Sequence, residues 1–352
     1  MGFFKKHKII TTLLILLLVL ILLLALLVGV FYLYVWNKLS LINYDDGKLP
    51  PQEEVVEALP PEVQEQLEEE IQQEIEQEAI HMEMEIAELP SMDAIISEKE
   101  IADEKAVFNV LLLGTDERVA DFSIDARADS IMLLSVNREN ECLRLVSLQR
   151  GMGVPILEGE YAGQYDWLTH CFRYGGADLM MKEVQHCFRV EVDRYVRINF
   201  SHFEKMVDAV GGVDIWLSEA EAKYMGLEAG VNHLNGTRAL QYSRLRYIDS
   251  DWSRIERQRN VIEAIVVAAK GLSLWELNEA ANEILPLIQT NLTKSEIVEL
   301  LLFAPNVIGK EIEQMSLPAE ETYGGMTGMG GRSLYAVDFE ANAKILEEFL
   351  YQ

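Results

Sequence analysis

The side chains best suited to chemistry lie in an arginine-rich stretch, residues 242–258, which reads YSRLRYIDSDWSRIERQ. The chain has a formal net charge of -28 at pH 7, and this is its one dense cationic segment. Guanidinium groups bind phosphate oxygens through paired hydrogen bonds, so the stretch is suited to clamp a phosphate or pyrophosphate. The same composition also fits a surface loop whose arginines pair with local carboxylates. The segment alone leaves both interpretations open.

A helix is predicted to begin inside this stretch, at Ser253. Ser253 and Glu256 have the Ser-x-x-Glu spacing of a capping box and precede an apolar run. Arg254 and Arg257 would then lie in the first helical turn, where the helix dipole disfavours cations. An anion bound at that N-terminus would offset the penalty, which favours the phosphate interpretation.

Two aspartates near predicted strand ends are candidates for binding a metal ion. Asp116 follows one apolar run, and Asp129 begins the next. If these runs are neighbouring strands, the two carboxylates lie close together and suit Mg²⁺ beside a phosphate substrate. Arg127 comes two residues before Asp129, and Arg150 ends the third predicted strand. Each aspartate alone fits a turn residue, and the nearby arginines favour a shared site.

Composition and motifs exclude several other classes of function. The chain has no Ser-His-Asp spacing, no His-Glu-x-x-His zinc motif and no P-loop. Three cysteines are too few for a disulfide framework. The acidic balance argues against nucleic acid as a partner.

The N-terminal region predicts one membrane-spanning helix. No charged residue occurs from Ile9 to Trp36, a length that crosses a bilayer and exceeds the apolar core of a cleaved signal peptide. Three lysines precede the run and Lys38 follows it, which predicts that residues 1–8 are a cytoplasmic tail. The rest of the chain would then lie outside the cell.

Residues 37–105 are predicted to be an acidic linker or stalk. There is no Lys or Arg from Leu49 to Ser97, and glutamate dominates. Between Pro61 and Pro90 one narrow apolar stripe recurs at helical spacing. This pattern favours a solvated helix, and a self-associating coiled coil is the alternative.

Residues 106–352 are predicted to form one α/β domain with a mixed sheet, because strands and helices alternate irregularly. The chain is 49% hydrophobic, which is enough to bury a core. The predicted strands are 108–114, 129–137, 142–148, 194–198, 213–217, 311–317 and 334–337. The predicted helices are 177–188, 199–210, 253–270, 274–288, 293–303 and 338–350, with a glycine-rich loop at 323–332.

Several long motifs in the domain resemble those of the LytR-CpsA-Psr family of cell-wall proteins. They are LLLGTDER, ARADSIMLLSVN, SLQRGMGV, RYGGADLMMKEV, RYVRINFSHFEKMVDAVGGVDI and LNGTRALQYSRLRYIDSDWSRIERQRNVI. The resemblance covers roughly residues 107–270, and the single N-terminal span is where the family has one.

The resemblance implies a membrane-anchored phosphotransferase on the outside of a Gram-positive-type bacterium. Such enzymes take a glycopolymer from an undecaprenyl-(pyro)phosphate carrier and attach it to peptidoglycan through a phosphodiester. The implied fold is a mixed sheet flanked by helices, with an apolar groove for the polyprenyl chain.

Carried over by position, the family's motifs assign roles to nine residues. Asp116 and Asp129 would hold Mg²⁺. Asp251 and Gln258 would act with Arg127, Arg150 and Arg254 in catalysis, orienting the arginines. The pyrophosphate would be bound by Arg127, Arg150, Arg244, Arg246 and Arg254.

The sequence also departs from the family pattern. Gly151 stands where the family usually has an aspartate, and Trp167 and Thr169 stand where it usually has Lys-x-Asn. These changes favour one alternative, a non-catalytic regulator that binds polyprenyl phosphate. A second alternative is a hydrolase that releases the polymer to water.

Overall fold

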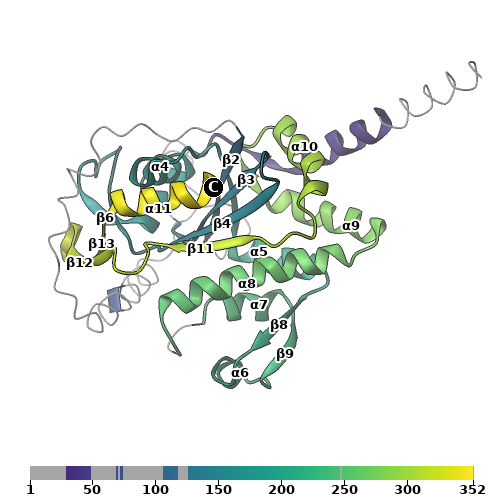
Figure 1. Cartoon of the computed structure of the whole chain (residues 1–352). Coiled ribbons are helices and arrows are strands. Elements are labelled where there is room, and N and C mark those ends of the chain that lie inside the picture. Colours follow the sequence, from purple (N-terminus) through teal and green to yellow (C-terminus); the bar gives the residue numbers. More distant parts are fainter. Residues whose placement is uncertain are drawn as a thin grey trace, which may run out of the picture.

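A seven-stranded mixed sheet forms the centre of the protein, as the irregular alternation of elements predicts (Figure 1). In this computed structural model the described residues are 29–48, 69, 72–73, 106–117, 126–245 and 248–351. The strand order is β1-β10-β7-β2-β3-β4-β11. The strands are β1 (Asn43–Tyr44), β2 (Val107–Thr115), β3 (Ala128–Asn137), β4 (Cys142–Leu148), β7 (Arg194–Asn199), β10 (Gln289–Thr290) and β11 (Glu313–Leu317).

The sheet is mixed because it contains both antiparallel and parallel strand pairs. β2, β3 and β4 are antiparallel neighbours, and the short connection at residues 138–141 favours this arrangement for β3 and β4. β7 runs parallel to β2, and β11 runs parallel to β4 at one edge. At the other edge β10 is antiparallel to β7 and parallel to β1.

Side-chain alternation in the central strands divides the domain into two layers. On β2 and β3, Leu111 and Leu133 belong to the main core, which includes residues of α4 (Leu168–Phe188) and α11 (Phe339–Tyr351). Their neighbours Leu112 and Met132 line a cavity on the opposite face. That face is covered by α5 (Phe200–Ala209) and α8 (Asp251–Lys270). The period of two along each strand therefore places one apolar set in each layer.

A second, smaller core lies beyond α8. It holds residues of the hairpin β8 (Val213–Leu217) and β9 (Gly230–Leu234), with α6 (Glu219–Met225) and α7 (Gly236–Ser243). Val261 of α8 joins this core, so α8 packs between the sheet and the hairpin (Figure 1).

Several elements differ from the sequence-based expectation. The expected loop at 323–332 contains a strand, because β12 (Tyr323–Thr327) pairs with β13 (Ser333–Val337) through the backbone despite its glycines. α4 begins before residue 177, with a non-helical break at Gly176 (φ 69°). The short strands β5 (Gly153–Pro155) and β6 (Tyr165–Trp167) were not expected, nor were β1, β9, β10, α6 and α7.

The remaining helices follow α8 on the side of the domain where the N-terminal segment docks. They are α9 (Leu274–Ile284) and α10 (Lys294–Phe303). Short 3-10 turns occur at Leu39–Leu41, Leu285–Leu287, Ala304–Asn306 and Met329–Gly331, the last of them between β12 and β13.

Most of the predicted membrane span, Ile9–Trp36, lies outside the described residues. Residues 29–38 are helical, and no helix in the described part of the chain is long and apolar enough to cross a membrane. Residues 39–48 were assigned to the linker, but Leu39 is buried and β1 extends the central sheet. The predicted stalk is described only at residues 69 and 72–73, where Gln72 exchanges two hydrogen bonds with Ser333.

Candidate functional site

Asp116 and Arg127 face each other at one end of β2 and β3. Antiparallel pairing sets Thr115 opposite Ala128, which brings the residues next to them together. The Arg127 backbone N–H donates to Asp116 Oδ1 at 2.9 Å, and its Nε and Nη2 donate to Oδ2 at 3.2 and 3.1 Å. Both side chains are buried, and Arg127 Nη1 has no hydrogen-bond partner among the described residues.

A second set of buried charges runs from β3 to the start of α8. Arg150 Nη1 lies 3.0 Å from Asp129 Oδ1, and Arg150 Nη2 lies 3.6 Å from Asp251 Oδ1. Arg254 Nε lies 3.0 Å from the same Asp251 oxygen. The structure therefore brings together four residues that the sequence placed in one site. They form a row in which carboxylates and guanidinium groups alternate, in the order Asp129, Arg150, Asp251 and Arg254. We call this set the charged row.

The two aspartates assigned to Mg²⁺ are neighbours, as the strand pairing predicts. Burial raises the pKa of Asp116, and the charge of Asp129 raises it further, whereas Arg127 opposes the rise. The described residues contain no group of three or more His, Cys, Asp or Glu side chains able to hold a metal. Because Mg²⁺ commonly takes one or two carboxylates plus substrate phosphates, this donor pair fits an ion that shares a phosphate ligand.

α8 begins three residues earlier than the sequence predicted. Ser250, not Ser253, is the N-cap, and its hydroxyl accepts from the Ser253 backbone N–H. Asp251 therefore occupies the first turn, where the dipole favours an acid, and Arg254 lies one turn further on beside it. The dipole argument for an anion near Arg254 is thus weaker than expected, and Asp251 already balances that arginine.

An apolar cavity of about 300 Å³ adjoins the charged row. It lies between the sheet and α5, α7 and α8, and its apolar lining includes Leu112, Met132, Val196, Phe203, Ile262 and Ile265. Its polar lining includes Asp129, Arg244, Arg254 and Gln258. Along α8, Arg254 and Gln258 come first and the apolar residues follow. The cavity therefore suits a ligand with a charged head and a hydrocarbon tail.

The arginine-rich stretch does not act as one cluster. Arg244 lines the cavity with its guanidinium 4.5 Å from the centre of the Phe200 ring. Arg257 instead pairs with Glu221 at 2.7 Å, and Arg259 donates to the hydroxyls of Ser147 and Ser316. Arg257 therefore links α8 to α6, and Arg259 links α8 to β4 and β11. Arg246 lies outside the described residues.

A buried ion pair beside the site was not expected from the sequence. Arg197 on β7 pairs with Glu117 and donates from Nε to the Thr115 hydroxyl at 3.2 Å. Burial lowers the pKa of Arg197 to about 9, while the charges of Asp45 and Asp116 oppose this, so it stays a cation at neutral pH. A charged residue within the apolar alternation RYVRIN was the available signal.

The departures from the family pattern have structural roles of their own. The Thr169 hydroxyl donates to the Ala128 carbonyl at 2.8 Å, and the Thr169 N–H donates to the Arg150 carbonyl at 3.1 Å. Trp167 is fully buried, and its Nε1 donates to the Ser333 carbonyl at 2.8 Å. Thr169 therefore holds the backbone next to Asp129 and at Arg150, two residues of the charged row. Trp167 has no positive charge to replace that of the lysine usual in the family.

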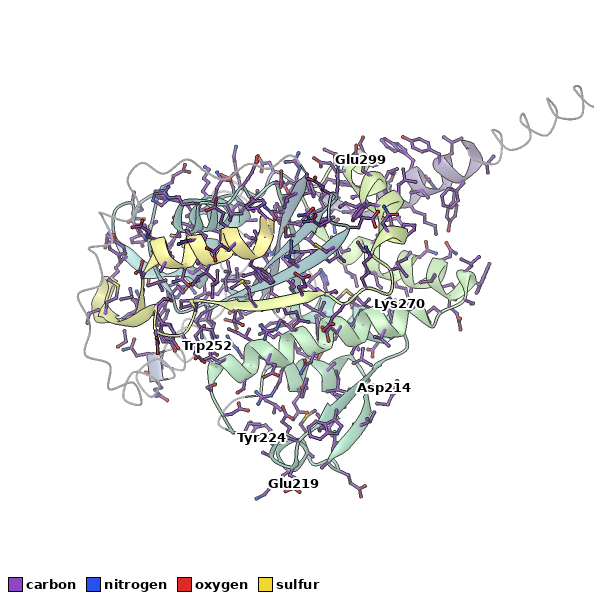
Figure 2. The ribbon with its side chains drawn as sticks, viewed as in Figure 1. Asp214, Glu219, Tyr224, Trp252, Lys270 and Glu299 are labelled. Carbon is purple, nitrogen blue, oxygen red and sulfur yellow. The ribbon has the colours of Figure 1, made fainter. Side chains whose placement is uncertain are left out.

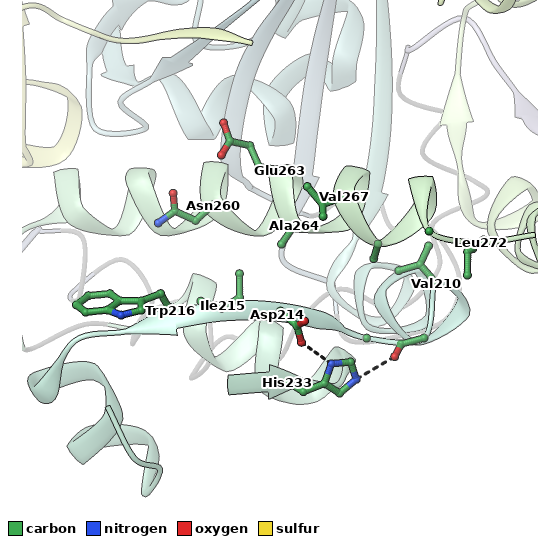
Figure 3. Close-up of a pocket in the computed structure, with 14 residues that line it drawn as sticks. Val210, Asp214, Ile215, Trp216, His233, Asn260, Glu263, Ala264, Val267 and Leu272 are labelled. Carbon is green, nitrogen blue, oxygen red and sulfur yellow. Dashed lines mark hydrogen bonds and ion pairs between the residues drawn. The ribbon is translucent and has the colours of Figure 1, made fainter. Parts of the chain in front are cut away.

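A second cavity, of about 680 Å³, lies between α8 and the β8–β9 hairpin (Figure 3). Asn260 and Val267 line it from α8. His233 Nδ1 is 2.8 Å from Asp214 Oδ1, and His233 Nε2 is 3.0 Å from the Gly211 carbonyl oxygen. The hydrogen bond with Asp214 raises the pKa of His233. None of the expected site residues that the structure describes lines this cavity, so it is separate from the charged one.

Comparison with known proteins agrees with this geometry. The sequence profile of the LytR_cpsA_psr family matches residues 64–349. The chain belongs to the LytR_cpsA_psr family. This confirms the resemblance seen in the motifs, and the match extends well beyond residues 107–270.

Relatives of this chain carry transferase names. The chain is 30% identical over 217 residues to the polyisoprenyl-teichoic acid–peptidoglycan teichoic acid transferase TagU of Bacillus cereus, covering 60% of this chain and 69% of that protein. It is 33% identical over 213 residues to the TagU of Enterococcus faecalis, covering 59% and 69%. A solved structure described as TagT bound to LIIa-WTA has 29% identity and a TM-score of 0.56, over 72% of this chain and 94% of that one.

Proposed function

We propose that this chain transfers a cell-wall glycopolymer from a polyisoprenyl-(pyro)phosphate carrier to peptidoglycan. The names of its TagU and TagT relatives support this class of reaction. The observation that carries the proposal is the cavity of about 300 Å³, because its lining combines Arg244 and Arg254 with a long apolar wall. A polyisoprenyl phosphate has a charged phosphate that suits the arginines and a hydrocarbon tail that suits the apolar wall.

In the proposed reaction a sugar hydroxyl of peptidoglycan attacks the phosphorus that carries the glycopolymer. A new oxygen–phosphorus bond forms, the pyrophosphate bridge breaks, and polyisoprenyl phosphate leaves with the bridging oxygen. The attacking hydroxyl gives up its proton, which the leaving polyisoprenyl phosphate takes up. The product is a phosphodiester between the polymer and peptidoglycan.

The buried arginines are placed to stabilise negative charge on the attacked phosphate and on the leaving phosphate. Arg254 and Arg244 contribute from the cavity wall, and Arg150 is linked to Arg254 through Asp251. Nη1 of Arg127, which has no hydrogen-bond partner among the described residues, is a further buried donor that a phosphate oxygen would satisfy. Mg²⁺ held by Asp116 and Asp129 would add positive charge at the same phosphates.

The same proposal places the enzyme at the outer face of the cell membrane. The uncharged run Ile9–Trp36 would span the bilayer, and residues 1–8 would stay in the cytoplasm. The acidic region at residues 49–105 would lie between the membrane segment and the catalytic domain. A carrier lipid resident in that membrane would then be within reach of the cavity.

A non-catalytic binder of polyisoprenyl phosphate is the second candidate function. Buried Trp167 and Gly151 stand where the family usually supplies a cation and an acid, which favours binding without turnover. The retained Asp116, Asp129 and Arg254 favour the transferase.

Filling the cavity tests where the lipid tail binds. Val196→Trp should weaken binding of undecaprenyl pyrophosphate at least tenfold, because Val196 lines the cavity. Binding of inorganic pyrophosphate to the same variant should be unchanged, since the arginines remain. Val231→Trp is the matched control, because Val231 is 72% exposed on β9. Unchanged binding of undecaprenyl pyrophosphate to Val196→Trp would show that the tail lies elsewhere.

A further inference from the structure

The helix at residues 29–38 runs alongside α9 in the same direction. Tyr34 donates a hydrogen bond to Asn278 and Lys38 donates one to Asn282, and both pairs are separated by the same 244 residues. A constant separation means that the two helices are parallel and in register over at least one turn. On α10, Lys294 lies over the Trp36 ring and donates to Ser40 at 2.6 Å, which holds the same segment from a second side.

The register places the start of α9 beside the residues that lead into the apolar run. One turn before Tyr34 is Val30, and one turn before Asn278 is Leu274, so these two residues lie at about the same level. Leu274 is 88% exposed and Trp275 is 70% exposed. Lys270, at the end of α8, is also exposed. We call the exposed segment from Lys270 to Trp275, which reads KGLSLW, the α8–α9 tip.

We propose that the α8–α9 tip is a second contact of this protein with the lipid bilayer. The proposal rests on the proposed membrane span, because it takes the bilayer position from that segment. If residues 9–36 cross the bilayer, Val30 lies within the span, about 9 Å before its end at 1.5 Å per residue. Leu274 is level with Val30, so Leu274 and Trp275 lie beside the last turns of the span. Tryptophan and leucine favour the membrane–water interface, and a nearby lysine favours anionic headgroups.

The surrounding charges allow this contact. Glu276 is adjacent to the tip, but its carboxylate accepts from the Ser273 backbone N–H at 2.8 Å in a capping box. Lys270 ends α8 on the same side of the molecule from which the N-terminal helix leaves, as Figures 1 and 2 show. The tip therefore carries one free cation, an exposed leucine and an exposed tryptophan toward the proposed bilayer.

The contact also fixes the direction from which a lipid enters the cavity. Figure 2 labels Trp252 and Lys270 near the two ends of α8. The axial distance from Arg254 to Lys270 is about 24 Å at 1.5 Å per residue. Between them Ile262, Ile265 and Val266 line the cavity. A carrier lipid would enter from the tip with its tail along these residues, and its phosphate would lie about 24 Å from the tip, measured along α8.

The test is to measure the depth of the tip in a bilayer with the full-length chain. Leu274→Cys and Tyr224→Cys, each in a Cys142→Ser background, would carry a nitroxide label in vesicles of phosphatidylethanolamine and phosphatidylglycerol. Cys171 and Cys187 are buried and remain. Tyr224 is the matched control, because it is 49% exposed on α6, far from the tip in Figure 2.

The label at 274 should be more accessible to oxygen than to a water-soluble nickel chelate, and the label at 224 should show the reverse. A chain that floats with the vesicles but has a water-exposed label at 274 overturns the tip contact and leaves the membrane span intact. A chain that does not float overturns the span and the contact together.

Discussion

Arg150 Nη1 lies 3.0 Å from Asp129 Oδ1, and both side chains are almost completely buried. The pair joins the end of β4 to the start of β3, directly beside the apolar cavity. Because a buried ion pair that loses one partner leaves an uncompensated charge, Arg150→Met should lower the free energy of unfolding by about 3–5 kcal/mol.

Chemical denaturation of the variant measures this loss. Arg138→Met is the control, because its ion pair with Glu299 is exposed and should contribute under about 1 kcal/mol. An equal loss of unfolding free energy in the two variants would contradict a stabilising role for the buried Arg150–Asp129 ion pair.

The arginines that line the cavity should provide most of the binding free energy for the phosphate groups of the lipid. Arg244→Ala and Arg254→Ala should each weaken binding of undecaprenyl pyrophosphate by tenfold or more, since desolvated charge contacts contribute about 2–5 kcal/mol. Arg238→Ala should bind as wild type does, because Arg238 is exposed and contacts the Met225 carbonyl and Gln241. Isothermal calorimetry distinguishes the outcomes, and wild-type affinity in both cavity variants would contradict the clamp.

Glu183 on α4 should make stability fall as the pH rises. Burial raises the pKa of Glu183 from 4.5 to about 8, although its acceptance of the Leu157 N–H opposes this. The folded state therefore holds a proton that the unfolded state releases, so stability is greatest below about pH 4.5 and declines up to about pH 8.

Glu183→Gln should remove this decline. Between pH 5 and pH 7 its unfolding free energy should rise relative to wild type by at most about 1.4 kcal/mol per pH unit. Denaturant midpoints at the two pH values measure the shift, with Glu348→Gln on the exposed face of α11 as the control for losing a carboxylate. A constant difference between Glu183→Gln and wild type would contradict a protonated Glu183.

The central strands and the proximity of Asp116 to Asp129 were predictable because they depend on local pattern. Continuous apolar runs identify β2, β3 and β4, and the short connection at 138–141 sets two of them antiparallel. The position of Asp116 beside Asp129 then follows from strand pairing. The predicted start of α8 at Ser253 was wrong, because Ser253 and Glu256 have capping-box spacing but the backbone shows that Ser250 is the N-cap.

Features that depend on packing between distant segments were not predictable. Arg254 and Arg257 are three residues apart, yet one lines the cavity and the other pairs with Glu221 on α6. The α6 and β9 segments are short and polar, and the glycines of β12 favour a loop until β13 supplies backbone partners. The docking of β1 onto β10 joins residues far apart in the sequence.

Metal dependence is a separate prediction about the two aspartates. Asp129→Ala should abolish the Mg²⁺ dependence of turnover and leave the lipid bound, because the apolar wall of the cavity is unchanged. Turnover and lipid binding measured across a Mg²⁺ titration check both parts. A variant that keeps the wild-type Mg²⁺ response would exclude Asp129 as a ligand.

The central claim is transfer of a glycopolymer to peptidoglycan, and a product assay with the full-length chain tests it most directly. The chain would receive a polyisoprenyl-pyrophosphate-linked oligosaccharide, Mg²⁺ and an uncrosslinked peptidoglycan glycan, with products analysed by mass spectrometry. The expected result is a phosphodiester-linked adduct of oligosaccharide and glycan, equimolar release of polyisoprenyl phosphate, and loss of both with Arg254→Ala. Bound donor without any product would instead establish a non-catalytic binder. Release of oligosaccharide phosphate without an adduct would establish a hydrolase, and either result would contradict the proposed transferase.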